Sequence, residues 1–185
     1  MANKQIKQTD YRMSSLEIIG SGEGVKLKFQ QKEEDANSIF WVEYQVKNPI
    51  PPHPDLVNTL NKLRKTIVRM FGFIHPDLVK SDEVMDEHEK EMYQEIINQV
   101  EITGLKLTGA DENVNVEISF TKKLVGGKRI SITCPKISKD FEDMDIDGEE
   151  TLAVIVAELQ NMTYRYQFKG WALQAQLDFT KTDAA

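Results

Sequence analysis

A chain of 185 residues with 40% hydrophobic and 29% charged side chains is long enough for one ordinary domain, or for two small units that share a core. No apolar run approaches the roughly 20 residues of a membrane-spanning helix, and the first ten residues are polar, unlike a secretory signal. The net charge of −7 argues against a large non-specific nucleic-acid surface, and a single cysteine favours a reducing compartment. We therefore expect a cytoplasmic protein with no membrane partner.

The first part of the chain carries three strand signals. Apolar residues alternate with polar ones there, which is typical of strands with one wet face. The stretches concerned are 16–19, 25–29 and 40–46. Three glycines between Gly20 and Gly24 supply the positive φ angles of a hairpin turn. A helix with leucines at helical spacing is predicted to follow from Pro54, and Gly72 is placed to end it.

The same pattern recurs in the second half, after a connector rich in Asp and Glu that predicts a solvated helix. The segment Val100 to Gly104 resembles Leu16 to Gly20, with the two glycines 84 positions apart. Alternation over 114–120 and 130–134 predicts two more strands, and an apolar stripe from Leu152 to Tyr166 predicts a closing helix.

Two units of three strands and a helix predict an α+β fold, with antiparallel sheet covered on one face by amphipathic helices. We expect the two sheets to join edge to edge, which protects open edge strands, and each helix to cover the apolar face of its own unit. The predicted boundaries are a flexible N-terminus at 1–10, the first unit at 11–73, the acidic connector at 74–99, the second unit at 100–170 and a tail at 171–185.

Basic residues support one hypothesis, a surface for single-stranded nucleic acid. Three cations share one side of the first predicted helix, and others stand with a tryptophan on strands. Such cations bind phosphates, and an aromatic ring on a sheet stacks bases. The candidates are Lys26, Lys28, Trp41, Lys62, Lys65 and Arg69. The alternative is an ordinary solvated surface.

Three aspartates resemble the opening of a calcium loop. Asp143, Asp145 and Asp147 stand at alternate positions before a glycine. The twelfth position of such a loop needs a bidentate Glu, and here it is Val154. The alternative is an acidic turn in which Asp147 caps the following helix.

Nothing in the sequence has the pattern of a catalytic constellation or of a cofactor site. The histidines lack the spacing of a zinc helix, there is no nucleophile elbow, and Cys134 stands on the apolar side of a predicted strand. We therefore predict no catalytic residue and no cofactor. An enzyme that uses a metal at the three aspartates is the least favoured hypothesis.

The tail carries a possible docking peptide. The segment Gln174 to Phe179 resembles the short peptide by which replication and repair proteins dock on bacterial sliding clamps, and Gln176, Leu177 and Phe179 match it in type. Asp178 stands where that pattern expects another apolar residue. The alternative is a final strand that packs on the sheet.

The second half also resembles small uncharacterised proteins encoded by tailed bacteriophages. The resemblance covers about residues 100–180 and lies in the segments 102–105, 113–120, 121–124, 127–128 and 168–170. It implies a bacterial host cytosol and an association with DNA metabolism. Our first hypothesis is therefore a non-enzymatic accessory protein that acts through a host or phage protein, or blocks a host factor. Binding of single-stranded nucleic acid is the second hypothesis, and self-association as a homodimer or a higher oligomer through strand edges is compatible with both.

Overall fold

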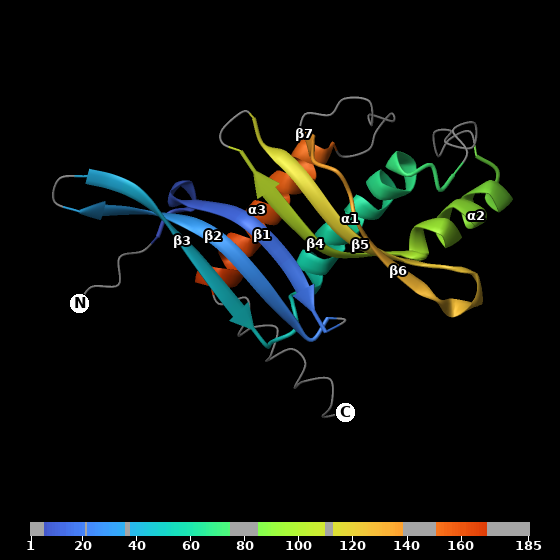
Figure 1. Ribbon diagram of the computed structural model, residues 1–185, viewed down its shortest axis with the longest axis horizontal. Coiled ribbons are helices and arrows are strands. Elements are labelled where there is room, and N and C mark those ends of the chain that lie inside the picture. The colour runs from blue at the N-terminus through green and yellow to red at the C-terminus, as the bar shows by residue number, and fades with distance from the viewer. Residues whose placement is uncertain are drawn as a thin grey trace.

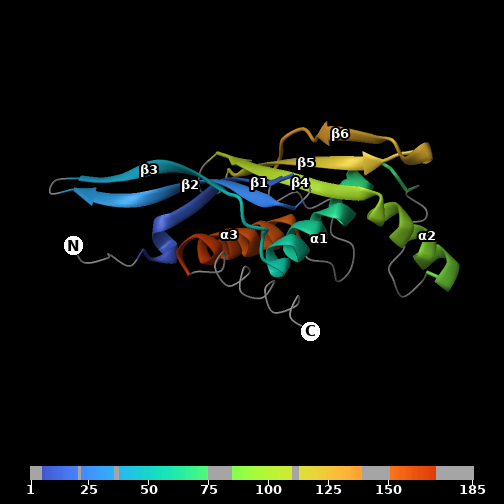
Figure 2. The ribbon, with the colours of Figure 1, turned by 90° about the horizontal axis from the view of Figure 1, so that it is seen from below.

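The fold is α+β, as the sequence predicts: one antiparallel sheet carries helices on one of its two faces (Figures 1 and 2). The computed structural model describes residues 6–20, 22–35, 38–74, 85–109, 113–138 and 151–169. The first unit consists of η1 (Gln8–Asp10), β1 (Tyr11–Ile19), β2 (Gly24–Asp35), β3 (Ser38–Asn48) and α1 (Pro54–Met70). The second follows the connecting helix α2 (Glu87–Asn98) and consists of β4 (Val100–Thr108), β5 (Asn115–Lys123), η3 (Val125–Gly127), β6 (Arg129–Thr133), β7 (Ile137–Ser138) and α3 (Leu152–Phe168).

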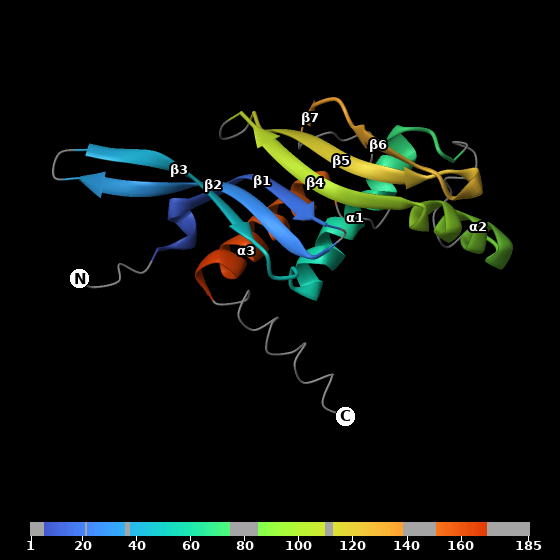
Figure 3. The same ribbon diagram turned by 60° about the horizontal axis from the view of Figure 1, so that its bottom comes forward.

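The two three-stranded units join through their first strands. The sheet order is β3-β2-β1-β4-β5-β6, with the short β7 also beside β5 (Figure 3). β1 and β4 run antiparallel, and only three residues of each pair across the junction, Ser15 to Glu17 with Lys106 to Gly104. The predicted edge-to-edge joining of two meanders is thus confirmed.

The two halves match more closely in structure than the sequence comparison indicates, and with a different alignment. β1 and β4 each have nine residues, and each carries a bulge at its fourth residue, Ser14 and Thr103. Tyr11 therefore corresponds to Val100, an offset of 89 positions rather than 84. The sequence alignment of Gly20 with Gly104 is wrong, because Gly20 turns the chain after β1 with a φ of 58°, whereas Gly104 lies inside β4.

The helices cover the sheet crosswise, which corrects the expectation that each lies on its own unit. α1 packs on β4, and Phe71 after its C-terminus meets Phe120 of β5 with ring centroids 5.1 Å apart. α3 packs on β1, and Phe168 at its end meets the rings of Tyr11 and Phe29 at 5.8 and 5.7 Å. The two helices cross beneath the sheet, with α1 running under β4 and α3 running under β1 (Figure 1).

The core between sheet and helices is built by the alternating residues that the sequence identifies. Leu16, Leu27, Val116, Ile118 and Phe120 are all at most 2% exposed on the sheet side. They meet the apolar stripes of the helices, of which Leu56, Leu60, Leu63, Ile67 and Leu159 are at most 1% exposed. Among the described residues, no helix is both long and apolar enough to cross a membrane.

The helix starts are set by local hydrogen bonds. His53 caps α1, because its Nδ1 accepts a hydrogen bond from the backbone N–H of Asp55 at 3.2 Å, and Pro54 occupies the first helical position. This gives His53 a structural role that the sequence did not suggest. Asp86 and Glu89 form a reciprocal capping box at the start of α2, an otherwise largely exposed connector.

The start of α3 corrects one expectation about the acidic loop. Thr151 is the N-cap, since its side chain accepts a hydrogen bond from the backbone N–H of Val154 at 3.3 Å. Asp147 is therefore not the cap of this helix. The helix begins four residues later than an Asp147 cap would place it.

Candidate functional site

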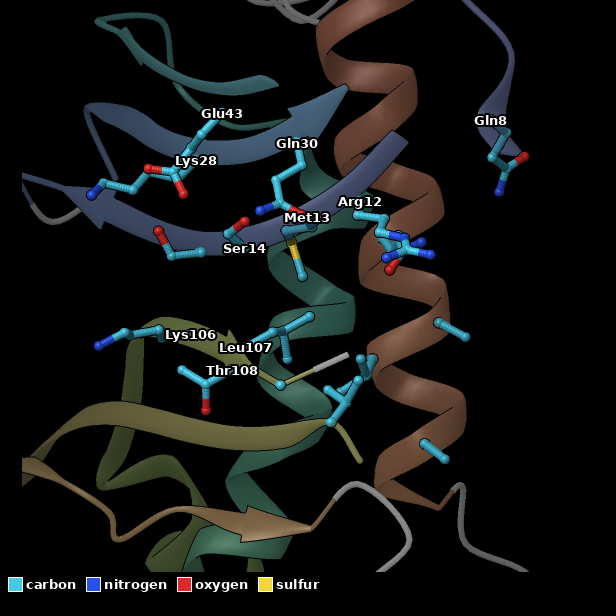
Figure 4. Close-up of a pocket in the computed structure, with 17 residues that line it drawn as sticks. Gln8, Arg12, Met13, Ser14, Lys28, Gln30, Glu43, Lys106, Leu107 and Thr108 are labelled. Carbon is cyan, nitrogen blue, oxygen red and sulfur yellow. The ribbon is translucent and has the colours of Figure 1, made fainter. Parts of the chain in front are cut away.

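A cleft opens at the junction of the two units. From the three paired residues at the junction, β1 continues towards its start and β4 towards its end without further pairing to each other. A cleft of about 1090 Å³ lies between them, with α3 passing behind it (Figure 4). We call this space the inter-unit cleft.

The walls of the inter-unit cleft come from both units and from α3. The β1 side contributes Gln8, Arg12, Met13, Ser14 and Ser15, with Lys28, Gln30 and Glu43 from the neighbouring strands. The β4 side contributes Lys106, Leu107, Thr108, Gly109 and Val114. α3 presents Ala153, Val156, Ala157 and Gln160, whose two alanines leave room behind the strands. The bulge at Ser14 adds an extra residue to β1 at the cleft wall.

The charges that line the cleft are mostly positive. Ser15 pairs with Lys28 on one side and with Lys106 on the other, so the two lysines stand on either side of β1. At normal strand spacing their backbones are about 10 Å apart. Neither lysine forms an ion pair with a described residue. With Arg12, they place three cations around a lining in which Glu43 is the single acid among the described residues.

The cleft lies within a wider face of the sheet that the described helices leave uncovered, which we call the open face (Figure 2). Strand register assigns to it the residues that alternate with the core. Its cations are Arg12, Lys26, Lys28, Lys32, Lys47, Lys106, Lys123 and Arg129. Its acids are Glu17, Glu34, Glu43, Glu101 and Glu117. The open face is thus net positive on a chain whose total charge is −7.

Two ion pairs neutralise part of the open face, and neither contains a lysine that lines the inter-unit cleft. Glu17 pairs with Lys26 at 3.2 Å, and Glu101 pairs with Arg129 at 2.8 Å. Lys28 and Lys106 beside the inter-unit cleft have no such partner among the described residues. The positive potential is therefore expected to concentrate at the cleft.

An arginine and a tryptophan form a flat platform next to these lysines. The guanidinium carbon of Arg12 in β1 lies 4.3 Å from the centre of the Trp41 ring in β3, across the intervening β2. This is a cation–π contact, and it holds the guanidinium plane and the half-buried indole together on the open face. Both groups present surfaces on which a nucleic-acid base stacks.

The structure divides the predicted basic candidates between two faces. Lys26, Lys28 and Trp41 lie together on the open face. Lys62, Lys65 and Arg69 lie on α1, in the helix layer under the opposite face, where Lys62 pairs with Glu158 of α3 at 2.8 Å. The six residues therefore do not form one continuous surface.

Sequence reasoning missed Arg12 and Lys106, the two residues that complete the basic cluster. Arg12 precedes the apolar stretch from which the first strand was predicted, so it was not assigned to either face of the sheet. Lys106 follows Gly104, which the comparison of the two halves treated as a turn. Side chains alternate between the two faces of a strand, and Tyr11 and Leu105 are buried. The residues that follow them, Arg12 and Lys106, therefore point to the solvent-facing side.

The lone thiol is a core residue, as predicted. Cys134 is 2% exposed, and its Sγ accepts a hydrogen bond from the backbone N–H of Ile118 at 2.9 Å. Burial raises the pKa of the thiol, which disfavours the reactive thiolate.

Two predicted sites lie outside the described residues. These are the metal candidates Asp143, Asp145 and Asp147 and the partner-binding candidates Gln176, Leu177 and Phe179. Within the described ranges, no three His, Cys, Asp or Glu side chains come together as metal ligands would.

Fold and site together define a two-unit α+β protein with a basic cleft at the pseudo-symmetric junction. Comparison with protein families, with curated proteins and with solved structures found no match to this chain.

Proposed function

We propose that this chain is a non-enzymatic cytoplasmic protein that binds single-stranded nucleic acid across its open face and the inter-unit cleft. The observation that carries the proposal is the charge separation between this face and the rest of the chain. Clustered Lys and Arg bind phosphates by releasing the counterions that are condensed on the nucleic acid. A chain of net charge −7 can do this only where its cations are gathered in one place.

The cleft offers the two elements that single-strand binding needs. Lys28, Lys106 and Arg12 provide the cations for the backbone. Arg12 and Trp41 provide the platform for bases, and base stacking contributes about 1 to 3 kcal/mol per base.

The experiment is a titration of the full chain into a labelled oligothymidylate, with fluorescence anisotropy as the readout and at several salt concentrations. The test variant is K28E/K106E on the open face. The matched control is K62E/K65E on α1, which makes the same change of charge on the opposite side. We expect wild type and control to bind with a salt-dependent affinity, because single strands release about 0.7 counterions per phosphate contact.

In K28E/K106E we expect the affinity and the salt slope to fall, while W41A loses affinity with the slope kept. No binding of the wild type at low salt contradicts the proposal. So does an equal loss in the K62E/K65E control. Circular dichroism of each variant checks that the fold is kept.

Action through a protein partner remains the other proposal, supported by the sequence of the tail. Gln176, Leu177 and Phe179 carry the likeness to a clamp-docking peptide. Its test is binding of a purified bacterial sliding clamp to the full chain and to a triple alanine variant at these positions. Loss of binding in the variant supports the proposal, and no binding of the full chain refutes it.

A further inference from the structure

The outer edge of β3 differs from the edges that soluble sheets usually present. β3 pairs with β2 along all eleven residues from Ser38 to Asn48, without a bulge. No described strand pairs with its other side, where β3 forms the edge of the sheet (Figure 3). The backbone N–H and C=O groups of alternate residues, which do not bond β2, face outward along that edge. Natural sheets blunt such edges with proline, bulges or short strands, and β3 has none of these.

The opposite edge of the same sheet is blunted in this manner. β6 has only five residues, and the chain then moves across to pair as β7 with β5. The two edges of the sheet therefore differ in how far they are protected from pairing with a further strand. The long edge, β3, is the one on which a further strand fits.

The side chains of β3 that face the helix side form an apolar row. Phe40, Val42, Tyr44 and Val46 occupy alternate positions, and Phe40 and Tyr44 remain 42% and 36% exposed. β2 and β3 extend past the last paired residue of β1, so this row continues beyond the part of the sheet that α3 covers (Figure 1).

We propose that β3 pairs antiparallel with β3 of a second copy of this chain, about a two-fold axis that passes midway between the Val42 residues of the two copies. A two-fold axis normal to the sheet keeps like faces together, so the apolar rows of the two copies become continuous. In this register Val42 faces Val42 and Phe40 faces Tyr44 twice, which covers the exposed aromatic rings of both copies. Cross-strand aromatic pairs of this kind stabilise a sheet.

Like-charge repulsion disfavours the neighbouring register that is centred on Glu43. An axis midway between two Glu43 residues would set Glu43 against its own copy, and like charges directly opposite are destabilising. With the axis at Val42, Glu43 faces Trp41, and no acid faces an acid within the paired residues 38–46. The two open faces then lie on the same side of one continuous sheet.

The test is sedimentation of the full chain over a wide range of concentrations, with substitutions at the proposed axis. V42K and V42E each place like charges opposite each other in a homodimer, and we expect each to raise the dissociation constant about tenfold or more. An equimolar mixture of V42K and V42E sets Lys against Glu, and we expect it to restore association. The matched control is V125K at the β5–β6 turn, a fully exposed valine far from β3, which leaves association unchanged.

A covalent readout keeps the register testable if a charge variant folds poorly. In V42C/C134S the only thiols of two copies meet at the axis, and mild oxidation should link them as a disulfide dimer. T121C/C134S, with its thiol on β5 inside the sheet, should not be linked. A wild type that stays monomeric to roughly 100 µM, or a V42K/V42E mixture that does not reassociate, overturns the proposal.

Discussion

The two units share their central strands and differ in their outer hairpins. β1 and β4 have nine residues each and bulges at equivalent positions, whereas β2 and β3 have twelve and eleven residues against nine and five in β5 and β6. No residue of β3 or β6, the two outermost strands, is buried, whereas β1, β2, β4 and β5 each contribute buried residues to the core. The difference teaches that the fold depends on the four inner strands and their helices, which leaves the long outermost strand β3 free to carry a surface for binding.

Because each helix covers the sheet of the other unit, the two units are not independent of each other. Thr163 of α3 contacts the sulfur of Met13 in β1, and Thr59 of α1 contacts that of Met162 in α3. Tyr164 donates a hydrogen bond to the carbonyl of Ile6 at 2.6 Å. The apolar face of each meander is thus closed by the helix of the other unit, and neither unit contains its own complete core.

The largest expected effect is the loss of folding when the units are separated. We expect a fragment of residues 1–80 and a fragment of residues 81–185 each to lack cooperative thermal unfolding, because each exposes the sheet face that the other helix covers. Mixed in equal amounts, they should regain the circular dichroism spectrum and melting transition of the intact chain. Cooperative unfolding of either fragment alone would contradict the interlocked core.

A single core deletion at the junction should come next in magnitude. Leu16 pairs with Leu105 across β1 and β4 and is 1% exposed. We expect L16A to lower the free energy of unfolding by about 2 to 5 kcal/mol, measured by urea denaturation, because it leaves a cavity in a packed core. The control is I39A on the outer hairpin, where the side chain is 61% exposed, with an expected change within about 0.5 kcal/mol. Equal losses would show that the outer hairpin is part of the cooperative core.

The sequence predicts the elements of this fold well, because their signal is local. Alternation over 25–29 and the leucine spacing of α1 depend only on neighbouring residues that share one buried face. The prolines that end β3 and open α1 act through their own missing N–H groups. These features need no knowledge of distant contacts.

The crossing of the helices and the site could not be predicted in the same way. A stripe such as Leu152 to Tyr166 shows that a helix is covered and does not show which strand covers it. The inter-unit cleft depends on where β1 and β4 stop pairing, a property of two strands whose paired residues are 87 to 91 positions apart in the chain. The repeat alignment was misplaced because it matched two similar segments that occupy different places in their strands: residues 16–20 lie at the end of β1, whereas residues 100–104 open β4.

Alkaline pH should weaken a contact between α3 and the first unit. Burial raises the pKa of Tyr166 from its ordinary value of 10.0 to about 12, and its hydroxyl donates to the carbonyl of Ile50 at 3.3 Å. The folded state therefore holds this proton over an interval in which the unfolded chain releases it. The contribution to stability is complete below pH 10 and is lost as the pH rises towards 12, by up to about 1.4 kcal/mol per pH unit.

The measurement is urea denaturation between pH 8 and about pH 11.5, with Y166F as the comparison. The variant should be less stable at pH 8 by about 1 kcal/mol through the lost hydrogen bond, and its stability should fall less steeply with pH. Burial also raises the pKa of Tyr11, so part of the alkaline loss should remain. Parallel pH profiles of wild type and Y166F would contradict the role of this tyrosine.

The smallest expected effect compares an ion pair between the units with one inside a unit. Lys62 of α1 and Glu158 of α3 are 2.8 Å apart, and so are Arg129 and Glu101, which both belong to the second unit. Each pair is partly exposed, so a double-mutant cycle to alanine should give a coupling of about 0.2 to 1 kcal/mol that weakens with salt.

In the split chain, only the first pair joins the fragments. K62A should therefore weaken reassociation of the fragments, and R129A should leave it nearly unchanged. Equal effects of K62A and R129A on reassociation would mean that the helix–helix contact between the units is not where the fragments are held together.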